Sequence, residues 1–144
     1  MHKEHSEGCW VSLILRLAVA SLFIGAAVPK WMGPPGRTAQ MFQTMFQATW
    51  LPMPLVTLHG QLTPWIELVL PIWLILGFRL SWAWTVTGLY LVSLAFGMVV
   101  AQKYEVAAFN YLYVLMACAG LHFSRHDGLS IDAFGKKKEG CCGG

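Results

Sequence analysis

The chain reads WIELVLPIWLIL from Trp65 to Leu76, an apolar run that a single charged residue, Glu67, interrupts. A run of this kind is typical of a membrane-spanning helix, where a carboxylate costs roughly 2.5–3.5 kcal/mol on insertion scales. A chain retains such a group where it has a charged partner, a proton or a function. Glu67 is therefore where we look first for the function of this protein.

The composition of the whole chain agrees with a membrane protein. Of the 144 residues, 56% are hydrophobic and 12% are charged, whereas a soluble domain carries about 25% charged residues. Apolar runs close to the ~20 residues that a membrane-spanning helix needs lie at about 10–28, 57–77, 80–101 and 106–122. They do not alternate as barrel strands do, and the connections after the second and third runs are short. We therefore expect an all-α membrane protein, a four-transmembrane-helix up-down bundle.

A short amphipathic segment separates the first two runs. Pro29 and the Gly-Pro-Pro-Gly stretch at 33–36 predict the end of the first helix, and residues 38–50 then place Met and Phe on one face and Gln and Thr on the other. We expect a short amphipathic interfacial helix here, which either covers the bundle or acts as a lid over a ligand site. Residues 1–134 are predicted to form this single bundle, and residues 135–144 a flexible tail rich in Lys, Cys and Gly.

Basic residues predict the orientation in the membrane. Six of them fall on one side of the predicted bundle and three on the other, and positive residues gather on the cytoplasmic side. The two sets are Lys3, Arg79, Arg125, Lys136, Lys137 and Lys138 against Lys30, Arg37 and Lys103. Both termini are therefore predicted to be cytoplasmic. The bilayer is the expected partner, and nucleic acid is not, because the basic residues form no patch interleaved with aromatics.

Two basic residues are candidate partners of Glu67. Arg16 interrupts the first apolar run, but it lies only about six residues from the cytoplasmic start, roughly 9 Å deep, and could miss Glu67 by a turn or two. Lys30, at the outer end of that run, is the alternative. His59 lies about two turns before Glu67, at the outer mouth of the second span. These residues predict either a polar centre that handles protons or a buried pair that fixes the helix register.

Cysteine and histidine residues give weaker predictions of a metal site. Cys118, His122 and His126 follow one another at intervals of four residues, which would place them on one helix face. The adjacent Cys141 and Cys142 near the C-terminus could bind a soft metal ion. The alternatives are a structural role for the first group, and lipid attachment or an unused tail for the second.

The order of these features resembles the DoxX family of small four-helix membrane proteins. The motifs that carry the resemblance are Leu15-Arg16-Leu17-Ala18 through Lys30, Leu51-Pro52-Met53-Pro54, Glu67 with Leu76-Gly77-Phe78-Arg79, Asn110, and Leu129-Ser130-Ile131-Asp132-Ala133. They extend from residue 15 to about 134. The sequence departs from the family pattern at Ala27 and Val28, where the family often has Gly, and in the tail from Gly135.

The resemblance implies a role in redox chemistry at the membrane. It makes an integral membrane accessory or anchoring subunit of a redox complex the expected function, with other membrane subunits as partners and no catalysis by the chain alone. A quinone is the cofactor it suggests, and His59, Glu67 and Asn110 are the residues expected at its headgroup. The location implied is an inner membrane of bacterial or archaeal type. A soft-metal transporter and a purely structural assembly subunit are the alternatives.

Overall fold

The computed structural model describes residues 2–124, with side chains from Gly8 onward, and this part of the chain forms five helices. The helices are α1 (His2–Met32), α2 (Arg37–Phe46), α3 (Met53–Leu76), α4 (Leu80–Val100) and α5 (Tyr104–Phe123). The prediction of an all-α chain is confirmed for these residues. The helix boundaries after the first span lie within a few residues of the predicted ones.

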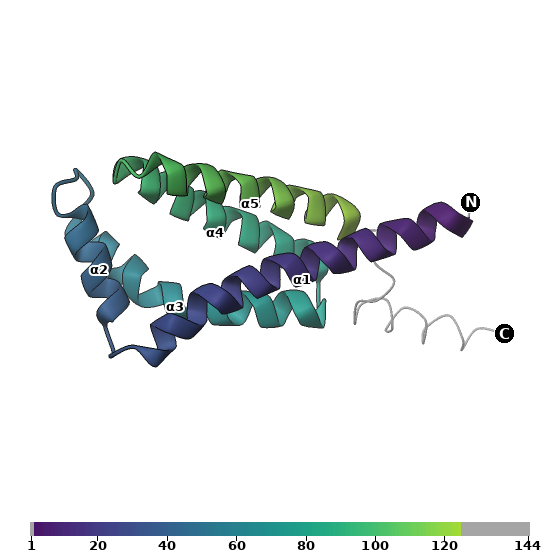
Figure 1. Cartoon of the computed structure of the whole chain (residues 1–144), viewed down its shortest axis with the longest axis horizontal. Helices are drawn as coiled ribbons and strands as arrows, with labels where there is room; N and C mark the ends of the chain where they lie inside the picture. Colours follow the sequence, from purple (N-terminus) through teal and green to yellow (C-terminus); the bar gives the residue numbers. More distant parts are fainter. Residues whose placement is uncertain (1, 125–144) are drawn as a thin grey trace.

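The long helices run alternately in opposite directions, and α2 lies across the end of the molecule at which α3 begins (Figure 1). The most extensive contacts join α4 to α5 and α1 to α3, and α2 packs on α3. The contact between α3 and α4 is the least extensive of the main helix pairs, although these two helices are consecutive. That sparse contact leaves room beside α3 that the functional site uses.

Helix α1 continues beyond the predicted break at Pro29 and ends only at Met32. Proline lacks a backbone N–H and removes one hydrogen bond from the helix, that to the carbonyl of Gly25. The last turn is nevertheless held in place by α3, because Lys30 and Trp31 both bond to residues of that helix. A tertiary contact thus overrides the local signal, and it carries Lys30 into the site on the helix itself.

Two hydrophobic clusters hold the helices together. The larger lies among α1, α3, α4 and α5, and its buried members are Val19, Phe23, Leu70, Leu74, Leu80, Ala83, Trp84, Tyr90, Leu91 and Ala117. The smaller joins α2 to α3 through Phe42, Phe46 and Val56. The sequence placed Met41 on the packing face of α2, but it is exposed, and Thr38 and Ala39 are buried in its place. The rotation of α2 therefore differs from that predicted by apolar periodicity, because small residues fit closest to α3.

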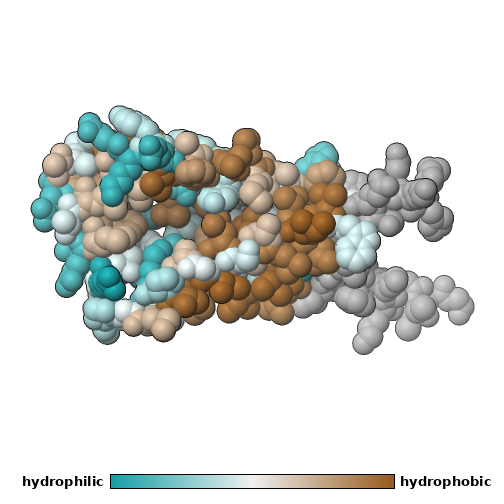
Figure 2. Space-filling view, in the orientation of Figure 1, coloured by the Kyte–Doolittle hydropathy of each residue, from teal (hydrophilic) through white to brown (hydrophobic). Residues whose placement is uncertain are grey.

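Three helical segments of the described chain are long and apolar enough to cross a membrane: Gly8–Met32, α4 and α5. Helix α3 has 24 residues, about 36 Å at 1.5 Å per residue, which is also long enough. It falls outside this set because polar residues, among them His59, Gln61 and Glu67, interrupt its apolar run. The hydrophobic residues cover the middle of the molecule, and the α2 end is more hydrophilic (Figure 2).

Gly60 fixes the distance between α2 and α3. A Cβ atom added at Gly60 would lie 2.9 Å from the Cα atom of Ala39 and 3.3 Å from the Cβ atom of Phe42. The first of these is a backbone atom, so the whole of α2 would have to move.

We therefore expect Gly60→Ala to destabilise the protein by about 1–3 kcal/mol, the usual cost of overpacking. Gly25→Ala on α1 is the matched control, because nothing lies within 4 Å of its added Cβ atom. There the better helix propensity of Ala should stabilise by up to ~1 kcal/mol. Unfolding in detergent micelles, followed by circular dichroism, measures both. Equal effects of the two substitutions would contradict the close contact between α2 and α3.

Candidate functional site

Glu67 lies on the inward face of α3 and is almost completely buried. The face is set by helical spacing, since the buried residues Gly60, Thr63, Glu67, Leu70 and Leu74 follow one another at intervals of three or four. Pro71 follows one turn later and has no N–H, so the backbone carbonyl of Glu67 cannot accept the usual helical hydrogen bond. The carboxylate therefore lies at a locally polar point within an apolar helix.

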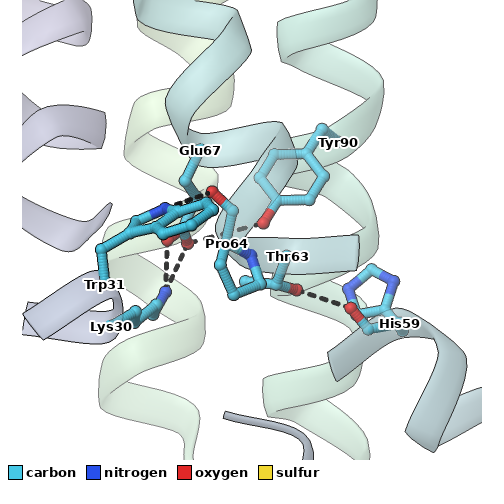
Figure 3. Close-up of polar contacts among 7 residues, drawn as sticks. All are labelled: Lys30, Trp31, His59, Thr63, Pro64, Glu67 and Tyr90. Carbon is cyan, nitrogen blue, oxygen red and sulfur yellow. Dashed lines mark hydrogen bonds and ion pairs between the residues drawn. The ribbon is translucent and has the colours of Figure 1, made fainter. Parts of the chain in front are cut away.

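Lys30 is the charged partner of Glu67. Its Nζ atom donates to both carboxylate oxygens, at 2.6 Å to Oε1 and 2.5 Å to Oε2 (Figure 3). The Glu67 side chain is 4% exposed and that of Lys30 23% exposed. A lysine can bury its stem and keep its ammonium group near water. The pair thus connects a buried carboxylate to the edge of the molecule, and of the two partners that the sequence left open, the structure selects Lys30.

Arg16 has a different role. Its Nε atom donates to the carbonyl of Leu74 at 2.8 Å, and Nη2 donates to the carbonyl of Ile75 at 2.5 Å. The last four carbonyls of a helix have no amide partner within it, and they carry its partial negative charge. Arg16 therefore caps the C-terminal end of α3 from a neighbouring helix. Leu74 lies two turns beyond Glu67, about 11 Å along the axis.

Tyr90 and His59 extend the polar contacts from Glu67 to the other side of α3. The hydroxyl of Tyr90, buried on α4, lies 3.5 Å from Oε1 of Glu67, a long contact. The His59 ring stacks on the Tyr90 ring at a centroid distance of 6.2 Å and an interplanar angle of 27°. Lys30, Glu67, Tyr90 and His59 together form the Glu67 centre. Three helices, α1, α3 and α4, contribute to it.

Two tryptophans lie beside Lys30 at the edge of the molecule. The Trp31 indole donates to the carbonyl of Pro64 at 3.2 Å (Figure 3). It also meets Trp65 edge to face, with ring centroids 4.7 Å apart. Indoles with one polar and one apolar side are common where a membrane protein meets water. The pair therefore joins the end of α1 to α3 next to the ion pair.

An apolar cavity of about 280 Å³ opens on the opposite side, where His59 forms part of its wall. Its lining comes from α2, the N-terminal half of α3, the C-terminal end of α4 and the loop before α3. The lining residues are Phe42, Phe46, Leu51, Leu55, Val56, Leu58, His59, Leu62, Ser93, Leu94, Phe96, Gly97 and Met98. The Glu67 centre therefore lies between an apolar cavity on one side and the Lys30 edge on the other.

The remaining candidates do not join this centre. Asn110 is half-buried on α5 and makes no hydrogen bond to the four residues of the centre. Cys118 and His122 are exposed on the same helix, and among the side chains that the structure describes, from Gly8 to Ser124, no three of His, Cys, Asp or Glu are placed to hold a metal ion. His126, Cys141 and Cys142 lie outside the described residues, so both metal-site predictions remain predictions.

Tyr90 is the member of the centre that the sequence analysis missed. It is the only tyrosine in the third predicted span, and it lies at the middle of α4, ten residues from each end. A phenol at that depth needs a hydrogen-bonding partner, so its position could have indicated a polar neighbour. Arg16 was missed as a helix cap because no local pattern links it to the end of α3.

The unequal burial of Lys30 and Glu67 predicts unequal effects of removing either one. Lys30→Met leaves a carboxylate without its cation in the interior and should cost about 3–5 kcal/mol. Glu67→Gln leaves an ammonium group that can reach water, and should cost about 1–2 kcal/mol. The double variant Lys30→Met/Glu67→Gln should recover most of the loss, because it removes both charges of the pair. Unfolding of the four proteins in micelles forms a double-mutant cycle; equal losses in the two single variants would refute the asymmetry.

Removal of the α3 cap should loosen the end of that helix. Arg16→Leu leaves the carbonyls of Leu74 and Ile75 without their side-chain donor, at a cost of about 2–3 kcal/mol, while Arg16→Lys should retain part of the bonding. Amide hydrogen exchange measures the effect, because protection should fall in the last turn of α3 and around Gly77 but not at Glu67. Unchanged exchange in the last turn would show that Arg16 is not needed as a cap.

Comparison with known proteins agrees with the geometry. The DoxX family model matches residues 11–103, which include Arg16, Lys30, Glu67 and Tyr90. The motifs beyond residue 103, at Asn110 and at 129–133, lie outside the matched region. No curated protein and no solved structure shows significant similarity to the chain. The matched region covers well over half of the 144 residues, and together with three helices apolar enough to span a bilayer it shows that the chain is an integral membrane protein that belongs to the DoxX family.

Proposed function

We propose that all four long helices cross the bilayer, with α2 lying at the outer interface and both termini in the cytoplasm. The polar residues of α3 support its inclusion, because Thr63 and Glu67 are buried inside the protein. The exposed side of α3 is mostly apolar, with Leu55, Leu58 and Leu62 in its first half, and Gln61 is its exposed polar residue there. A helix of this kind can lie in lipid, since its charge is paired within the protein. Residues 1–134 would then form one bundle unit.

Within this arrangement, we propose that the protein is an accessory or anchoring subunit of a quinone-linked redox complex. The observation that carries the proposal is the Lys30–Glu67 ion pair, buried in a bundle that has no need of a charge for packing alone. Intramembrane ionisable residues are costly and commonly mark proton or ligand pathways. When bound, a quinone would supply two-electron redox chemistry coupled to the uptake or release of protons.

The residues present fit such a headgroup. The His59 side chain lines the cavity, and its ring nitrogens make no hydrogen bond to any described residue. An imidazole can donate to or accept from a carbonyl or hydroxyl group in that position. Behind it, Tyr90 and Glu67 lead to Lys30, the member of the centre that reaches the surface. In this proposal, His59 forms a hydrogen bond to the headgroup. Glu67 and Lys30 hold a proton between the cavity and water.

Large exposed apolar side chains support an association with lipid or with partner subunits. On α4 these include Trp82, Leu89 and Phe96, and on α5 Phe109 and Leu115. Aromatic residues are enriched both at protein interfaces and at the edge of the bilayer. We propose that part of this surface carries the larger subunits of the complex.

The test is purification from native membranes in a mild detergent, followed by identification of the chains and lipid-soluble molecules that accompany the protein. We expect membrane redox subunits and a quinone. Glu67→Gln should lower the quinone-dependent rate of the complex about 100-fold, the usual contribution of a positioned proton-transfer group, while the complex still assembles. Glu105→Gln is the matched control, because Glu105 is an exposed carboxylate in the first turn of α5. The proposal would be contradicted if the chain were isolated alone, or if the complex with Glu67→Gln kept its full quinone-dependent rate.

A further inference from the structure

The cavity beside His59 opens toward the apolar perimeter of the bundle. Its wall includes Leu55, Leu58 and Leu62, which lie on one side of α3 and are about half-exposed, and the similarly exposed Phe96 of α4. If α3 crosses the bilayer as proposed above, these side chains would meet acyl chains. The opening lies where α3 and α4 make only sparse contact. A molecule dissolved in the membrane can therefore reach the cavity without crossing the aqueous phase.

The inner wall of the cavity is closed and apolar. Phe42 and Phe46 of α2 and Val56 of α3 are buried there, so surrounding lipid does not reach them except through the cavity. The hydroxyl of Ser93 donates to the carbonyl of Tyr90 at 2.7 Å, within its own helix. His59 therefore supplies the available polar contact, and the rest of the wall suits hydrocarbon.

The volume limits what the cavity can hold. At about 280 Å³ it is nearly twice the ~150 Å³ cavity that accommodates a benzene molecule. That space suits one substituted ring or a short length of hydrocarbon chain, but not a complete membrane lipid. Gly97 helps to keep it open, because a Cβ atom at this position would lie 3.4 Å from Cζ of Phe46.

We propose that this cavity is a site for a lipid-soluble molecule that enters sideways from the bilayer, with its head at His59 and its hydrocarbon tail leaving between α3 and α4. The identity of the head as a quinone rests on the function proposed above, whereas lateral entry rests on the cavity alone. Helix α2 forms the outer cover of the site. The tail lies on the lipid side of the Glu67 centre, and Lys30 lies on the other.

The experiment uses the full chain in phosphatidylcholine nanodiscs, with a hexadecanol that carries a diazirine on the third carbon, beside its hydroxyl group, as the probe. After illumination, mass spectrometry should find label on Phe42, Phe46 or Val56, which only the cavity exposes. Gly97→Leu should lower this labelling about tenfold, the loss expected when an added side chain overfills a packed site. Labelling of the perimeter residue Leu115 should stay unchanged in the same sample. Gly25→Leu is the control, since its side chain points into open space.

A second variant, Leu62→Trp, narrows the opening without entering the helix packing, and it keeps the test decisive if Gly97→Leu fails to fold. Loss of label from the buried wall in either folded variant supports lateral entry. Absence of such label in the unaltered protein, or its persistence in both folded variants, overturns it. The chemical nature of the head is then tested by competition, in which a decyl benzoquinone and decanol are compared for how far each reduces the labelling. Equal competition would remove the quinone from the proposed function while leaving the lateral site in place.

Discussion

The ion pair between Lys30 and Glu67 is the constraint on which the arrangement of α1 and α3 depends. A carboxylate that is 4% exposed needs its cation within bonding distance, so the end of α1 must stay beside the middle of α3. Arg16 fixes the same two helices at a second point, where its guanidinium meets the carbonyls at the end of α3. The two contacts lie about 21 Å apart along α1 but only about 11 Å apart along α3. The length of the two side chains lets both contacts form, and neither helix can slide along the other without breaking one of them.

Helix α3 shows why a functional membrane helix can be less apolar than its neighbours. His59, Thr63 and Glu67 lower its hydropathy, yet they lie toward the inside of the bundle or line its cavity. Pro64 and Pro71 each remove a backbone donor, which leaves the carbonyls of Gly60 and Glu67 without their helical partners. Apart from the exposed Gln61, the residues that weaken α3 as a membrane span are therefore ones that form or adjoin the Glu67 centre.

The sequence was enough to predict the helices, the family and a charged residue within a helix at Glu67, because composition, run length and a charge inside an apolar run are local signals. It could narrow the partner of Glu67 only by counting residues along each helix. Such a count gives neither the length of the side chains nor the rotation of α1 about its axis. It therefore left both Arg16 and Lys30 as candidate partners of Glu67. Tyr90 was missed for a related reason, since its contact with Glu67 joins residues 23 positions apart on different helices. The continuation of α1 through Pro29 likewise depends on bonds to α3.

The position of the Glu67 centre gives its two sides different surroundings. On one side, His59 meets an apolar cavity whose rim is formed by exposed apolar residues of α3 and α4. On the other, Lys30 is partly exposed. In the proposed function, a proton would exchange with water at the Lys30 side without water entering the cavity, because Glu67 and Tyr90 lie buried between them. A lipid-soluble ligand and the protons it exchanges would thus use separate routes. The two routes would meet at Glu67, whose buried charge costs several kcal/mol in a membrane.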